Sequence, residues 1–132
     1  MAGGRVEVLP KGKATVYLRR AENLLKTMEW AETEGNPDGV ATNAVQASIA
    51  LADAYTVFFL QQRSRGQDHR EVVVLLARTK TPNASEVGRL VQRILNRKSE
   101  VEYQDRDVRM GDGRELARYA RSLDALVRAD LR

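Results

Sequence analysis

Apolar side chains recur at intervals of three and four residues along most of this sequence, and this spacing constrains the fold more than any other feature. The first such stretch predicts an amphipathic helix from about Lys11 to Glu34, because residues three and four apart share one helix face. Its apolar positions are Ala14, Tyr17, Leu18, Ala21, Leu24, Leu25, Met28 and Ala31. The turn-forming residues 35–39, Gly-Asn-Pro-Asp-Gly, are expected to end this helix.

The same spacing predicts further helices along the rest of the chain. We expect them over residues 40–63, 68–79, from 82–85 to about 98, and 114–131, with a polar, irregular segment over 99–113. Gly88 falls inside one of them and indicates close packing or a local irregularity. Short loops favour antiparallel neighbours, so the predicted fold class is all-α, an antiparallel up-and-down bundle of four to five helices.

The length of 132 residues is typical of one domain. Residues 1–10 have no helical period, so we expect a flexible N-terminal arm in which Val6, Val8 and Leu9 extend along the bundle. We expect residues 11–132 to form a single helical-bundle domain. The chain has no cysteine, and its longest apolar stretch, residues 47–60, is too short and too polar to span a bilayer. We therefore expect a cytoplasmic protein with no membrane partner.

The net charge of +4 comes from the C-terminal part of the chain. Residues 1–77 carry nine basic and nine acidic side chains, whereas residues 78–132 carry thirteen basic and nine acidic ones. A basic surplus attracts phosphates, which makes RNA or a nucleotide a candidate partner. The alternative is that these charges only cover solvated helix faces, because acidic residues are interspersed among them.

Polar residues cluster where the second and third predicted helices meet. Arg63, Arg65, Asp68 and His69 lie there around a glycine turn. An arginine can hold a phosphate while a nearby histidine acts as acid or base, and such a pair can cleave RNA through its own 2′-hydroxyl. The alternative interpretation is structural: Asp68 caps the third helix, Arg65 is solvated, and His69 packs near the helix start.

Helical geometry places Asp53 on a largely apolar face of the second predicted helix, together with Ile49 and Val57. A buried carboxylate has to be paired, hydrogen-bonded or protonated, and Arg63 or His69 would be a near partner. Asp53 then belongs either to a polar ligand pocket or to a structural ion pair. The candidate ligand-binding set is Asp53, Arg63, Arg65, Asp68 and His69.

The acidic segment of residues 100–112 does not match a calcium loop, because Arg109 and Met110 stand where a ligand and a glycine are needed. Nor does the sequence contain a phosphate-binding glycine loop, a hydrolase nucleophile elbow or a zinc ligand set. We therefore expect no metal and no cofactor.

Three stretches resemble the HEPN superfamily, the helical nucleotide-binding-associated domains of prokaryotes and higher eukaryotes. Residues 43–54, Asn-Ala-Val-Gln-Ala-Ser-Ile-Ala-Leu-Ala-Asp-Ala, resemble the family's second helix. Residues 63–69 followed by residues 72–76 resemble the junction and third helix of some bacterial members. The basic residues 95–103, which end in Glu102-Tyr103, together with the last predicted helix resemble the family's closing segment. The resemblance implies a bundle of four or five helices that often forms a homodimer.

Some HEPN proteins are ribonucleases of toxin–antitoxin or other defence systems. Their motif is an arginine, four to six residues, and a histidine, and Arg63 and His69 with five residues between them match it. The resemblance thus implies that Arg63 holds the scissile phosphate and His69 acts as acid or base. In the family the motif usually lies nearer the last helices. Many members lack it and are non-catalytic partners of nucleotidyltransferases or other proteins.

Three hypotheses follow for the function. The leading one is a non-catalytic HEPN-like bundle that forms a homodimer and binds a nucleotide, nucleic acid or partner protein at the junction around Asp53, Arg63, Arg65 and His69. The enzyme hypothesis is a metal-independent ribonuclease that uses Arg63 and His69. The third is a plain helical dimerisation or interaction module.

Overall fold

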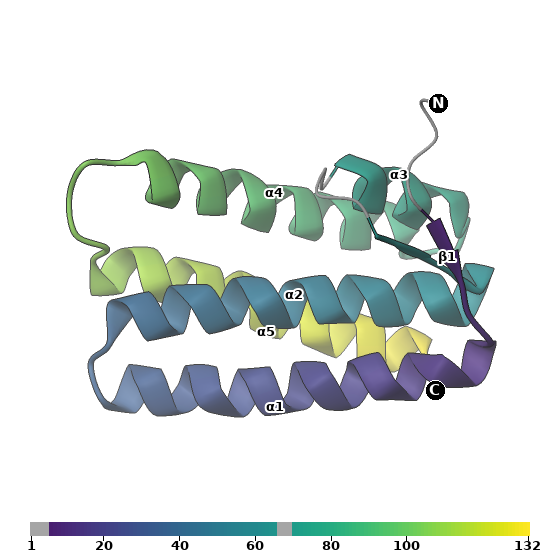
Figure 1. The fold of residues 1–132 in the computed structure, drawn as a ribbon, viewed down its shortest axis with the longest axis horizontal. Coiled ribbons are helices and arrows are strands. Elements are labelled where there is room, and N and C mark those ends of the chain that lie inside the picture. The colour runs from purple at the N-terminus through teal and green to yellow at the C-terminus, as the bar shows by residue number, and fades with distance from the viewer. Residues whose placement is uncertain (1–5, 66–69) are drawn as a thin grey trace.

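The computed structural model describes residues 6–65 and 70–132, and these form five α-helices and one small sheet (Figure 1). The helices are α1 Ala14–Thr33, α2 Pro37–Leu60, α3 Arg70–Arg78, α4 Ala84–Tyr103 and α5 Met110–Asp130; the strands are β1 Val6–Val8 and β2 Gln62–Ser64, and a 3-10 turn, η1 Lys11–Lys13, precedes α1. The four long helices lie side by side and alternate in direction, as Figure 1 shows. The prediction of an all-α helical bundle is confirmed.

The central element is α2, which contacts each of the other four helices. Small buried residues such as Ala44, Ala47 and Ala54 let its neighbours approach closely. Among the described helices α2 alone is long and apolar enough to cross a membrane, judged by length and composition. Most of that stretch is buried inside the bundle, as it is in the core helix of a soluble protein.

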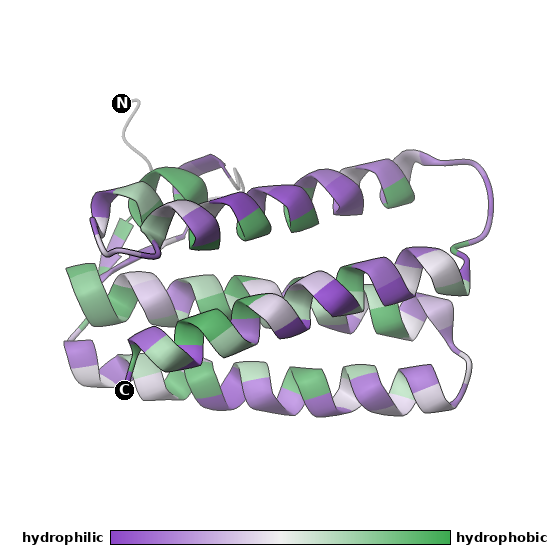
Figure 2. Cartoon of the chain, turned by 180° about the vertical axis from the view of Figure 1, so that it is seen from behind, coloured by the Kyte–Doolittle hydropathy of each residue, from purple (hydrophilic) through white to green (hydrophobic). Residues whose placement is uncertain are grey.

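The helix α4 is amphipathic, as its sequence spacing predicts. Figure 2 shows its hydrophobic residues on the side toward the bundle and its hydrophilic residues on the outer side. Val87, Val91 and Ile94 are buried on the inner side. The outer side is therefore free to carry the basic residues that the sequence concentrates in this part of the chain.

The second helix both begins and ends earlier than predicted, at Pro37 rather than residue 40 and at Leu60 rather than residue 63. Gln61 takes a left-handed conformation, with φ 54°, which stops the helix. The next residues form β2, which pairs antiparallel with β1 so that Glu7 lies opposite Arg63. From Val6 onward the expected arm is thus a strand held against the bundle. Helical spacing could not reveal this pairing, because the two strands lie far apart in the sequence.

The fourth helix is longer than predicted, and α5 begins earlier. Instead of ending near Lys98, α4 continues to Tyr103, because buried Val101 extends its apolar stripe and Lys98 pairs with Glu102 one turn later at 3.3 Å. The α5 helix begins at Met110, where the Asp112 carboxylate accepts the backbone N–H of Arg109 at 2.9 Å. The irregular segment is therefore much shorter than residues 99–113.

Two contacts fix α5 against α2. At one end, a Cβ on Gly113 would lie 3.2 Å from the side chain of Val40, so glycine permits a close approach of the two helices. At the other end, the hydroxyl of buried Tyr55 donates to Asp130 at 2.7 Å, and Asn83 donates to the same carboxylate at 2.8 Å. Burial, the largest cause, raises the pKa of Tyr55 to about 12, so its hydroxyl stays protonated and remains a donor.

Candidate functional site

Arg63, the proposed phosphate-holding residue, is engaged inside the fold. Its position on β2 points the side chain toward α2 and β1, where Nε donates to Asp53 Oδ2 at 3.1 Å and Nη1 donates to Glu7 Oε1 at 3.1 Å. The guanidinium also lies 5.1 Å from the centre of the Tyr17 ring. Two carboxylates and an aromatic ring therefore surround the group, so its charge is already compensated.

Asp53 is buried, with only 4% of its surface exposed. Burial is the largest influence on its carboxyl group and raises its pKa to about 6, although the hydrogen bond and charge of Arg63 act in the opposite direction. The cluster of Glu7, Tyr17, Asp53 and Arg63 thus joins the sheet to α1 and α2. It has the features of the structural ion pair that the sequence left open as an alternative.

Of the other candidate residues of the predicted junction, the structure describes only Arg65. Arg65 is exposed directly after β2. Asp68 and His69 lie outside the described residues. The structure therefore brings Asp53 and Arg63 together, and the proposed Arg63–His69 pair stays a prediction.

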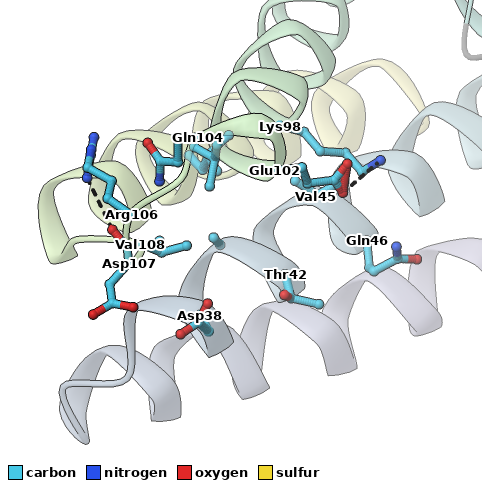
Figure 3. A pocket seen from close by; sticks show the side chains of 13 residues that line it. Asp38, Thr42, Val45, Gln46, Lys98, Glu102, Gln104, Arg106, Asp107 and Val108 are labelled. Atoms are coloured by element: carbon cyan, nitrogen blue, oxygen red, sulfur yellow. Dashed lines mark hydrogen bonds and ion pairs between the residues drawn. The ribbon is translucent and has the colours of Figure 1, made fainter.

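The opposite end of α2 carries a hollow of about 430 Å³ (Figure 3). The first turns of α2, the end of α4 and the loop before α5 line it, and its polar lining residues are Asp38, Thr42, Gln46, Lys98, Glu102, Gln104, Arg106 and Asp107. The Gln104 Nε2 group is buried and donates to no acceptor among the described residues. This hollow has three carboxylates against two cationic groups, so its charge disfavours a phosphate ligand.

The acidic segment near this hollow is neutralised by arginines. Arg97 binds Asp112 at 2.5 Å and Glu115 at 2.6 Å, and Arg106 approaches Asp112 at 3.3 Å. The backbone N–H of Arg109, followed by the charge of Arg106, lowers the pKa of Asp112. These carboxylates serve as cap and ion-pair partners. Over residues 6–65 and 70–132, no three His, Asp or Glu side chains gather as metal ligands would.

A second hollow of about 430 Å³ lies on the outer side of α4 and α5 and has a different charge. Its lining residues are Arg89, Gln92, Arg93, Asn96, Arg97, Glu100, Glu115 and Tyr119. The guanidinium groups of Arg93, from α4, and Arg118, from α5, each lie 5.4 Å from the centre of the Tyr119 ring. Neither makes an ion pair with a carboxylate of the described part of the chain.

Sequence reasoning missed this group of two arginines and a tyrosine, which we call the Arg-Tyr-Arg cluster. Arg93 and Tyr119 lie on different helices, and only the packing of α4 against α5 brings them together. The available signal was the basic surplus of residues 78–132, which indicated the C-terminal part of the chain but not which helix faces meet.

No protein-family model, curated protein or solved structure matches this chain. The functional interpretation therefore depends on the geometry and charge of its own residues.

Proposed function

We propose that this chain is a non-catalytic binding domain that holds single-stranded RNA on the outer side of α4 and α5. The observation that carries the proposal is the Arg-Tyr-Arg cluster, in which Arg93 and Arg118 lie over Tyr119 without a carboxylate partner among the described residues. Guanidinium groups bind phosphates in a fork geometry, and their planes, like aromatic rings, stack on bases.

The surroundings of the cluster support this ligand. Gln92 and Asn96 line the same hollow and offer amide groups that can hydrogen-bond base edges. Arg89 and Arg97 extend the row of arginines along α4, although both also pair with neighbouring carboxylates. The hollow near Asp38 has the opposite charge balance, which favours the α4–α5 side for an anionic ligand.

The contacts of Arg63 with Asp53 and Glu7 agree better with a binding role than with the ribonuclease alternative. To hold a scissile phosphate in a fork geometry, Arg63 would have to release Asp53 or Glu7, because its Nε and Nη1 groups already donate to them. Releasing Asp53 would leave a buried carboxylate without its partner, which is costly. The resemblance to the HEPN superfamily implies non-catalytic binding only for members without the motif, and Arg63 and His69 match that motif. The proposal therefore depends on the α4–α5 side and on the contacts of Arg63, not on the resemblance.

The proposal is tested by fluorescence anisotropy with a labelled 20-nucleotide oligouridine, using the wild type and the double variant Arg93→Gln/Arg118→Gln. Because two phosphate contacts are removed, the slope of log affinity against log salt should become shallower by about 1.4. The matched control is Lys13→Gln/Arg19→Gln, which removes two exposed charges from the α1 end and should leave the α4–α5 surface unchanged. Equal binding by both double variants, or no binding by the wild type, would contradict the proposal.

A further inference from the structure

A groove of about 670 Å³ runs between α3 and α4, at the end of the bundle where the sheet lies. It adjoins the RNA-binding hollow proposed above, but its lining is more apolar. Its lining residues include Val73, Ala77, Pro82, Ala84 and Gly88, with Lys80 and Arg89 as the charged members. The groove is therefore a second surface that residues 6–65 and 70–132 leave uncovered.

The α3 side of the groove presents apolar groups to solvent. Val73 lines the groove and is half-buried, and the adjoining Val74, which does not line it, is 50% exposed. Ala77, one turn further along, is also exposed. Figure 2 shows hydrophobic residues around much of this short helix. Exposed apolar side chains that are contiguous on one helix face indicate a contact surface more strongly than the same residues scattered singly.

Gly88 forms part of the floor of this groove, on α4. Apart from its chain neighbours and the backbone of its own helix, a Cβ built on it would meet no atom of the described residues within 4 Å, in contrast to Gly113, where a Cβ would press on Val40. The fold therefore does not need a glycine at position 88, and α4 continues through it as regular helix. The close packing expected there from the sequence is absent within the described chain. A glycine in a helix interior is less favourable than alanine, so its use here requires another reason.

The open space at Gly88 would let the backbone of another helix approach α4 closely, as small residues do at helix–helix contacts. The absent side chain of Gly88 and the apolar side chains of Val73 and Ala77 are independent observations, and all three residues line the same groove. Together they indicate that a partner helix occupies it.

The charge around the groove selects the kind of helix. Among the described residues, Lys80 and Arg89 line it and no acidic residue does. Arg89 forms an ion pair with Glu86 at 2.6 Å, while Lys80 makes no ion pair within the described residues. Arg78 adds an exposed positive charge at the end of α3. A second copy of this chain would bring the same basic side chains together, so self-association through this groove is disfavoured.

We propose that the α3–α4 groove is the docking site for an acidic amphipathic helix of a partner protein. The apolar face of that helix packs on Val73 and Ala77, its backbone approaches α4 at Gly88, and its carboxylates lie near Lys80 and Arg78. This is the helix-in-groove mode of recognition. It does not use Arg93 or Arg118, which carry the proposed RNA binding, although Arg89 and Gln92 line both hollows.

The test is selection from a displayed library of amphipathic 18-residue helices in which the polar positions vary freely. We expect wild-type selection to enrich Glu and Asp at those positions. The winning peptides, remeasured in solution, should lose affinity by at least about tenfold on Gly88→Trp, which fills the groove. Gly111→Trp is the control, because its Cβ position is equally open but lies at the start of α5. Circular dichroism establishes that both variants are folded.

Lys80→Glu provides a second readout that does not alter the shape of the groove floor. It should lower the affinity for acidic peptides. When the selection is repeated with this variant, the enriched residues should be Lys and Arg instead of Glu and Asp. The proposal is overturned if no peptide is enriched, if the enriched peptides are not acidic, or if they bind Gly88→Trp as tightly as the wild type. None of these outcomes depends on whether the protein binds RNA.

Discussion

Replacing Arg63 with methionine separates a structural role from a phosphate-binding one. Removing one partner of a fully buried ion pair costs roughly 3–5 kcal/mol of the free energy of unfolding. The Arg63 side chain is 28% exposed, so water screens part of the charge that is lost. At pH 7.5 we therefore expect Arg63→Met to lower the free energy of unfolding by about 2–3 kcal/mol.

The cost should depend on pH because the partner can take up a proton. The pKa of Asp53 is about 6 with Arg63 in place, and Arg63 holds it down. Without the arginine this pKa rises further, so at pH 5 the carboxyl is neutral and its burial is tolerated. The cost of Arg63→Met should then fall to about 1 kcal/mol, the value of a lost hydrogen bond.

Urea unfolding followed by circular dichroism at pH 5.0 and 7.5 measures both values. The control is Arg121→Met, which removes the half-exposed partner of Glu32 and should cost about 0–1 kcal/mol at either pH. If Arg63→Met costs no more than Arg121→Met, or costs the same at both pH values, then Arg63 is not the partner that stabilises the buried carboxylate of Asp53.

Three further predictions concern stability. Tyr55→Phe removes the hydroxyl bond to Asp130 and should lower the free energy of unfolding by about 1–2 kcal/mol; no loss in urea would contradict this. Gly88→Ala should raise it by about 1 kcal/mol, whereas Gly113→Ala should lower it, because only the second Cβ meets neighbouring atoms; thermal unfolding measures both signs. Because the pKa of Asp53 is raised, its contribution to stability is fully present below pH 4 and is lost as the pH rises through about 6. The difference in free energy of unfolding between wild type and Asp53→Asn should therefore change between these pH values and stay level above them.

The helices were predictable because their signal is local. Apolar residues spaced three and four apart placed α1, α3 and the interior of the other helices correctly, since each helix buries one face against α2. The boundaries that were wrong depend on contacts outside this pattern. Leu60 ends α2 because the next residues pair with β1, and Asp112 starts α5 early by capping its first turn.

The candidate site was predictable only in part, for the same physical reason. Asp53 could be recognised as a carboxylate on an apolar helix face, and Arg63 was near enough in sequence to be suggested as its partner. Glu7 completes the ion pair from the other strand, more than fifty residues away in the chain, and nothing local indicated it. The Arg-Tyr-Arg cluster likewise exists only because α4 and α5 pack together.

The central claim is that the chain holds single-stranded RNA without cleaving it, and one metal-free binding experiment tests this most directly. Wild-type protein and labelled oligouridine are measured by anisotropy at 50 and 200 mM salt, and the RNA is then recovered on a denaturing gel. The account predicts salt-sensitive binding that Arg93→Gln/Arg118→Gln weakens, with full-length RNA on the gel. If the wild type cleaves the RNA and the His69→Ala variant does not, the account is contradicted and the protein is a ribonuclease. If the wild type binds no RNA at all, the proposed ligand is contradicted.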